Sequence, residues 1–173
     1  DGAAAGTYTG KGGLFGASWA YTDGFSEILE EVNDGTGPST SDGCEPLVGF
    51  TPGRIAFIDR GTCEFGLKAI HAQSAGAYGV VIANNIAGTV AMAPGAVGRE
   101  VAIPVTLITE IDGNTIRPTL PASASHSVID VYGMHASGSP LLYAPNPVEE
   151  ASITHYDPSV GPNALMEPEV LAD

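Results

Sequence analysis

The four histidines and the scattered serines are the residues that could take part in hydrolysis, and none of them stands in a catalytic motif. Residues 16–20 (GASWA) lack the final glycine of a serine nucleophile elbow. The chain contains no HExxH pair, whereas a catalytic zinc needs three protein ligands and an open water position. The glycine clusters at residues 12–13 and 35–37 lack the Lys-Ser/Thr pair that binds phosphate. We therefore predict no catalytic activity for this chain alone.

Cys44 and Cys63 are the only two cysteines, and both lie beside turn signals. They could close one loop as a disulfide, which would stabilise the fold by about 3 kcal/mol. They could also remain two reduced, buried thiols. A zinc site built on them would need two further ligands at suitable spacing, which the sequence does not show.

Clusters of carboxylates offer a second kind of chemistry, the binding of calcium. One cluster pairs Asp34 with Asp42, and the other joins residues 149–150 to Asp157. Neither has the alternating ligands of a dedicated calcium loop, and such groups are usually solvated surface. Calcium therefore stays an open alternative at this stage.

The charge balance excludes two classes of partner. Twenty acidic and six basic residues give 173 residues a net charge of −14, which repels nucleic acid. The longest apolar run, near residues 79–83, is far shorter than the ~20 residues that span a bilayer, so we expect no membrane insertion. The chain begins at Asp1 without a leader, and we expect it to be a processed or excised segment.

The elements that would position these groups follow from the apolar pattern. Residues 54–58 predict a buried strand, residues 64–75 a helix closed by Gly76, and residues 78–83 a strand covered on both faces. This order is a βαβ unit, for which parallel pairing is expected.

A second set follows along the chain. Residues 103–108 predict a strand, Thr109 is a candidate N-cap for a helix to about residue 117, and residues 128–132 predict another strand. Residues 25–32 are interpreted as a short helix. With 43% apolar residues, 23 glycines and 13 prolines, we expect a real core with short elements and tight turns.

Three parts of the chain differ in character. Residues 1–43 are rich in small residues and are expected to cover the core. Residues 44–137 contain the predicted sheet and helices. Residues 138–173 form a proline-rich tail, and its prolines exclude a long helix.

The segment GRIAFIDRGTCEFGLKAIHAQSAGAYGVVIANN, followed by IPVTLITEIDGNTI, resembles the protease-associated (PA) domain family. The resemblance implies an α/β fold, a β/β/α swivelling domain that is β-rich with two or three short helices. It also implies a disulfide between Cys44 and Cys63. Members are non-catalytic modules in or beside secreted peptidases and sorting receptors, so the expected partners are polypeptide substrates or a peptidase domain of the parent protein.

Arg60, Thr62, Phe65, Asn84 and Asn85 are the candidate binding residues. Strand ends in open α/β sheets form crevices for ligands, so we predict that these residues line a shallow crevice for a peptide chain. The alternative is structural, with an arginine that braces a loop, a phenylalanine that anchors the helix and an asparagine pair that tolerates left-handed backbone.

The tail segment LYAPNPVEEASITHYDPSVGPNALMEP resembles the part of leishmanolysin-like metzincins that carries the third zinc histidine and the methionine turn. The resemblance implies that His155 would be a zinc ligand and Met166 the turn methionine. Residues 138–173 would then be part of a split metallopeptidase domain, whose other zinc ligands would lie upstream of this chain. The remaining alternatives are an ordinary loop histidine, and a chain that is only a structural spacer of a cell-surface protein.

Overall fold

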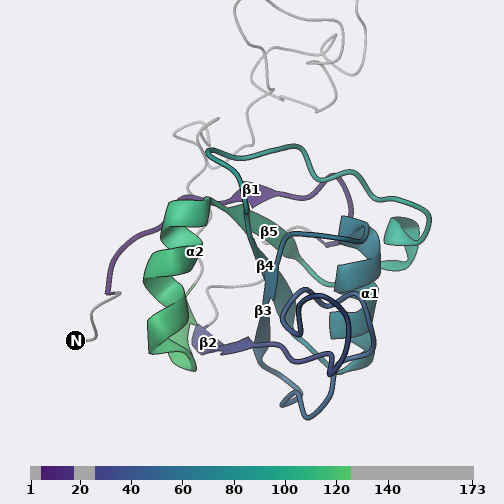
Figure 1. The fold of residues 1–173 in the computed structure, drawn as a ribbon, viewed down its shortest axis with the longest axis horizontal. Coiled ribbons are helices and arrows are strands. Elements are labelled where there is room, and N and C mark those ends of the chain that lie inside the picture. The colour runs from purple at the N-terminus through teal and green to yellow at the C-terminus, as the bar shows by residue number, and fades with distance from the viewer. Residues whose placement is uncertain (1–4, 18–25, 126–173) are drawn as a thin grey trace, which may run out of the picture. The chain divides into compact units, whose positions relative to one another are not determined.

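The computed structural model describes residues 5–17 and 26–125, which form a six-stranded mixed sheet and two α-helices (Figure 1). The strand order is β1-β5-β4-β3-β2-β6. The four central strands are parallel, while β1 pairs antiparallel with β5 and β6 antiparallel with β2. The strands are β1 (Lys11–Gly12), β2 (Ser26–Glu31), β3 (Ile55–Asp59), β4 (Gly79–Ala83), β5 (Val105–Ile108) and β6 (Ala122–Ser125). The predicted α/β class is confirmed.

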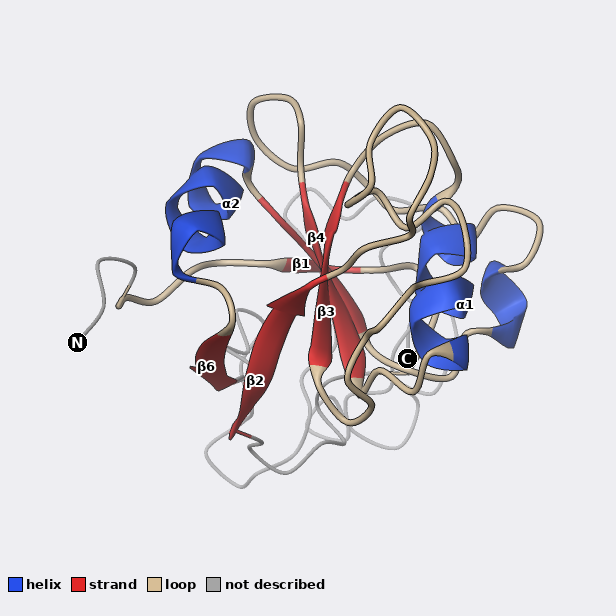
Figure 2. Ribbon diagram, turned by 60° about the horizontal axis from the view of Figure 1, so that its bottom comes forward, coloured by secondary structure: helices blue, strands red, loops and turns tan. Residues whose placement is uncertain are grey.

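The two α-helices cover opposite faces of the sheet, as Figure 2 shows. Helix α1 (Phe65–Ser74) packs with the 3₁₀ turn η2 (Gly98–Glu100) on one face. Helix α2 (Glu110–Ile116), followed by the 3₁₀ turn η3 (Arg117–Thr119), covers the other. Because both faces are covered, the central strands are nearly continuous apolar runs.

The predicted βαβ unit is confirmed as β3, α1 and β4. The two strands are neighbours in parallel register, with Phe57 opposite Val81. Gly76 follows the helix at φ +84°, a left-handed conformation that glycine adopts without a Cβ clash. The helix therefore ends where the sequence predicts.

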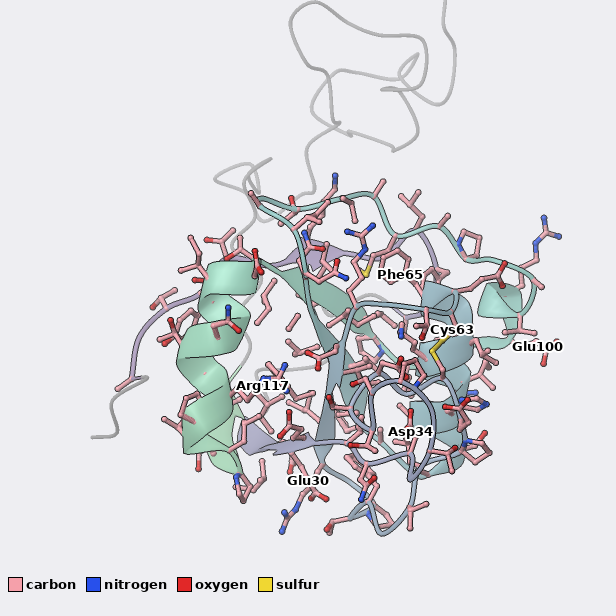
Figure 3. All side chains as sticks on the ribbon, viewed as in Figure 1. Glu30, Asp34, Cys63, Phe65, Glu100 and Arg117 are labelled. Atoms are coloured by element: carbon pink, nitrogen blue, oxygen red, sulfur yellow. A yellow bond between two sulfur atoms is a disulfide. The ribbon has the colours of Figure 1, made fainter. Side chains whose placement is uncertain are left out.

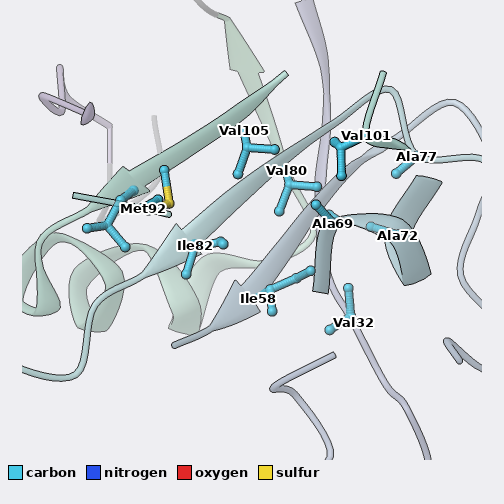
Figure 4. Close-up of a cluster of buried hydrophobic side chains, with 12 residues drawn as sticks. Val32, Ile58, Ala69, Ala72, Ala77, Val80, Ile82, Met92, Val101 and Val105 are labelled. Atoms are coloured by element: carbon cyan, nitrogen blue, oxygen red, sulfur yellow. The ribbon is translucent and has the colours of Figure 1, made fainter. Parts of the chain in front are cut away.

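A separate hydrophobic cluster fills each face of the sheet. Toward α1, side chains of β3, β4 and β5 such as Ile58, Ile82 and Val105 lie in one cluster with Ala69 and Ala72 (Figure 4). Toward α2, Phe57 lies in a smaller cluster with Ile116. This burial is the main source of stability.

The second predicted strand and helix are confirmed as β5 and α2. The Thr109 hydroxyl accepts a hydrogen bond from the Asp112 N–H and caps the helix. After η3 the chain forms β6, which pairs with β2 at the opposite edge from β1. The strand predicted at residues 128–132 lies outside the described residues.

The helix predicted over residues 25–32 is wrong, because this segment forms β2. Its Leu29 lies opposite Ile55 of β3 and Ala122 of β6, and is buried between the two neighbours. Pairing on both edges outweighs the local helix preference of the glutamates. Both β1 and β2 lie in residues 1–43, the segment expected to cover the core.

Residues 5–17 and 26–125 belong to one compact unit, and residues 128–173 lie outside the described residues. Within the described ranges, no helix is long and apolar enough to cross a membrane.

Candidate functional site

A pocket of about 490 Å³ opens at the carboxyl ends of β3 and β4, beside the start of α2. Four of the five predicted binding residues line it, namely Arg60, Thr62, Asn84 and Asn85. Four separate chain segments build the pocket: the loop after β2, the turn after β3, the turn after β4, and α2 with its C-terminal end. The lining residues are Pro38, Ser39, Asp42, Asp59, Arg60, Gly61, Thr62, Ala83, Asn84, Asn85, Glu110, Asn114 and Arg117.

Arg60 joins the ends of the two strands. Its backbone N–H donates to the Ala83 carbonyl (2.8 Å), and its guanidinium donates to Asn84 Oδ1 (3.0 Å) and Asn85 Oδ1 (3.3 Å). The guanidinium carbon lies 5.9 Å from the centroid of the Phe65 ring, a cation–π distance. Phe65 is the first residue of α1; it packs against the core and does not line the pocket.

Asn84 and Asn85 differ in whether their side-chain amide nitrogen already donates a hydrogen bond. Asn84 is buried, and its amide donates to the Gly88 carbonyl (2.7 Å) while its oxygen accepts from Arg60. Asn85 is exposed, and no described residue accepts a hydrogen bond from its amide nitrogen. Asn114 of α2 is also exposed and makes no side-chain hydrogen bond to a described residue. Asn85 and Asn114 can therefore hydrogen-bond to a ligand.

The turn after β3 is tied to the loop after β2, which we call the acidic loop (residues 33–48). The predicted disulfide between Cys44 and Cys63 is present. Thr62 has φ +37°, unusual for a branched residue, and its hydroxyl donates to Asp42 Oδ2 (2.6 Å). These links hold the acidic loop against the strand end and make it one wall of the pocket.

Lys68 lies fully buried beneath the acidic loop. Its ammonium donates to the Asp42 carbonyl and lies 3.4 Å from Cys44 Sγ. Burial lowers the pKa of Lys68, although nearby carboxylates oppose the shift. Burial would raise the pKa of Asp42, but hydrogen bonds from Thr62 and Cys44 and the charge of Lys68 lower it overall.

The opposite side of the pocket contains an ion cluster centred on Arg117. Its guanidinium pairs with Asp59 and with Glu31, and its carbon lies 5.1 Å from the centroid of the Phe57 ring. Burial lowers the pKa of Arg117. Arg117 and Lys68 were not among the site residues predicted from the sequence. Only Lys68 had a local signal, since it shares a helical face with Ala72, one turn along α1.

The described residues do not provide a zinc site. Their one group of three clustered potential ligands is Asp34, Asp42 and Glu45, all carboxylates, whereas zinc sites use histidine or cysteine as well. Both cysteines are in the disulfide, and His71 Nδ1 lies 3.0 Å from the Gly43 carbonyl oxygen. His155 and Met166 lie outside the described residues, as do Asp157 and residues 149–150.

A mixed sheet with a parallel centre, a helix on each face and a polar pocket at its strand ends defines a small α/β domain. The chain belongs to the PA domain family, whose model matches residues 29–116, just over half of the sequence.

Curated relatives are peptidases. The chain is 45% identical over 56 residues to an aminopeptidase of Pseudomonas aeruginosa, which covers 31% of this chain and 10% of the relative. It is 42% identical over 64 residues to aminopeptidase YwaD of Bacillus subtilis, covering 37% of this chain and 14% of the relative. The chain therefore spans only about a tenth of the length of these relatives.

The solved structures that resemble this chain include aminopeptidases as well. BSAP, a zinc aminopeptidase from Bacillus subtilis, superposes with a TM-score of 0.50 at 30% identity, over 68% of this chain and 26% of that one. An aminopeptidase from Aneurinibacillus sp. strain AM-1 matches with a TM-score of 0.50 at 24% identity, over 68% and 26% of the two chains, which shows the shared fold. The family match ends before His155 and Met166, so their zinc-site assignment stays a prediction.

Proposed function

We propose that this chain is a non-catalytic accessory domain of a secreted peptidase, and that the pocket at its strand ends binds polypeptide. The observation that carries the proposal is the pocket lined by Arg60 and two exposed carboxamides, Asn85 and Asn114. The aminopeptidase relatives support the peptidase context. The disulfide supports secretion, since such bonds persist in oxidising compartments.

The free polar groups of the pocket match those of a peptide main chain. A carboxamide offers both donors and acceptors, which complement the C=O and N–H groups of an extended peptide. The guanidinium of Arg60 is held in place by Asn84 and Phe65, so little side-chain entropy is lost on binding. Because main-chain groups are common to all peptides, we expect weak and sequence-tolerant binding.

In the parent protein, the catalytic groups would lie outside the described residues. The relatives are several times longer than this chain, and one solved neighbour is a zinc enzyme. Zinc would therefore be bound by another part of the parent, which would hydrolyse the peptide that this domain holds. The partners are then a polypeptide substrate and the peptidase domain.

Titration of the ¹⁵N-labelled chain with a reduced, unfolded polypeptide tests the proposal. We expect saturable chemical-shift changes at residues 60–62 and 84–85 and at Asn114. Arg60→Ala removes the anchored guanidinium and should weaken binding at least fivefold. Arg99→Ala is the matched control, because Arg99 is an exposed arginine of η2 outside the pocket, and it should change affinity less than twofold.

Two results would contradict the proposal. The first is an absence of shifts near the pocket at millimolar peptide, which would favour a structural spacer. The second is an equal loss of affinity in the Arg60 and Arg99 variants, which would indicate binding through overall charge. Retention of the amide spectrum in both variants establishes that each is folded.

A further inference from the structure

The acidic loop contains three carboxylates around a common point. One oxygen each from Asp34, Asp42 and Glu45 lies within 4.8 Å of the other two. The loop is held closed by hydrogen bonds from the Asp34 N–H to the Thr40 carbonyl (2.9 Å) and from the Val48 N–H to the Asn33 carbonyl (2.7 Å). Figure 3 shows Asp34 on the loop near the disulfide that includes Cys63.

Two carboxylate oxygens of these residues are buried without a hydrogen-bond donor. Asp34 is only 3% exposed, and its Oδ1 has no partner among the described residues, while its Oδ2 accepts from the Cys44 N–H (3.1 Å). Oε2 of Glu45 is buried and likewise has no partner. A buried polar atom left without a partner costs about 1–3 kcal/mol, and more when it is charged. These atoms therefore indicate a missing ligand at the centre of the cluster.

The nearby protein charges do not balance the cluster. The three carboxylates contribute −3, and the adjacent ammonium of Lys68 contributes +1, which leaves −2. Lys68 directs its hydrogen bonds to the Asp42 carbonyl and to Cys44 Sγ, so it satisfies none of the carboxylate oxygens. One divalent cation would neutralise the remaining charge and pair with both orphan oxygens.

We propose that Asp34, Asp42 and Glu45 bind a calcium ion. Calcium prefers oxygen ligands at about 2.3–2.6 Å, so two of them can be up to about 5 Å apart across the ion, which covers the observed separations. Magnesium would need every pair within about 4.2 Å, at about 2.1 Å from the ion. Water would complete the coordination shell.

Calcium at this position would fix one wall of the pocket. The acidic loop contributes Pro38, Ser39 and Asp42 to the lining, and Asp42 is shared by the pocket and the cluster. The ion would therefore order the loop before a peptide binds. The cation site does not rest on the proposed peptide-binding function, because its ligands are defined by the cluster alone.

Isothermal titration of the chelator-treated chain with calcium chloride tests this site. We expect a dissociation constant between about 10⁻⁵ and 10⁻³ M, a rise in melting temperature with calcium, and at least tenfold weaker binding of magnesium chloride. Glu45→Gln should weaken calcium binding at least tenfold. Glu100→Gln removes one exposed carboxylate of η2 outside the cluster, and its affinity should stay within twofold of the unsubstituted chain.

Amide shifts of the unsubstituted chain locate the ion without relying on a variant. Calcium should move the signals of Asp34 and residues 42–45 saturably and leave Glu100 unchanged. The proposal is overturned if no saturable binding occurs at 10 mM calcium, or if the moving signals lie outside the acidic loop. Equal affinity in Glu45→Gln and the unsubstituted chain would overturn it as well.

Discussion

At the end of β3, single side chains connect segments that are distant in sequence. The Arg60 guanidinium bridges to Asn84 and Asn85 after β4, and Thr62 bridges to Asp42 in the acidic loop. The Cys44–Cys63 bond lies beside these contacts. Such links hold the turns in one arrangement, so the pocket does not depend on the turns' own weak conformational preferences.

The disulfide should contribute substantially to stability. In Cys44→Ser/Cys63→Ser, we expect the free energy of unfolding to fall by about 3 kcal/mol, because the unfolded chain is no longer constrained by the loop that the bond closes. Guanidinium unfolding followed by circular dichroism measures the change. Alkylation of the denatured chain should label no cysteine before reduction and both after it. Labelling without reductant would show that the bond does not form.

At the level of elements, close contacts between backbones set the position of α1 on the sheet. Gly66 lies in the first turn of this helix. It packs against Pro94, in the loop between β4 and η2, and against Gly98, the first residue of η2. There is no room for a side chain between these backbones. The helix can therefore approach η2 only because this position is glycine.

Gly66→Ala should destabilise the domain by about 1–3 kcal/mol. The new Cβ would overlap the Pro94 carbonyl oxygen and lie 2.7 Å from Gly98 Cα. In an open helix the same change would instead stabilise by about 0.5–1 kcal/mol. Urea unfolding measures the sign of the change in the free energy of unfolding. Gly12→Ala is the control, because nothing lies within 4 Å of a Cβ built at that position. A stabilised Gly66→Ala variant would contradict the packing.

At the scale of the whole molecule, the pocket presents polar groups that suit the recognition of a ligand. Among the described residues, the one cluster of potential metal ligands consists of carboxylates. The net charge of −14 would also oppose binding of polyanions. These properties fit a domain that works beside a catalytic partner, as the proposal states.

We expect the purified chain to release no product from aminoacyl p-nitroanilides, with or without added zinc. The physical reason is that catalytic zinc sites use three protein ligands that include histidine or cysteine, whereas the one cluster of three among the described residues is all carboxylate. A full-length zinc aminopeptidase serves as the positive control. Metal-dependent release by this chain would refute the assignment of a non-catalytic role.

Several features followed from the sequence alone. The βαβ unit, the end of α1 at Gly76 and the Thr109 cap depend on residues within one or two turns of each other, so local patterns predict them. The family resemblance added the disulfide, and the positions of Arg60, Thr62 and the two asparagines at strand ends predicted one side of the pocket. The end of α1 and the Thr109 cap are short-range features, and short-range physics is sufficient to specify them.

Other features were decided only in the folded chain. Residues 26–31 have local helix preference but form a strand, since β3 and β6 offer hydrogen bonds on both edges. Arg117 reaches Asp59 because segments distant in sequence meet at one end of the sheet, and the conformation of the acidic loop brings Glu45 to Asp34. Hydrogen bonding and burial across such separations depend on where the whole chain goes, and no local window of sequence contains that information.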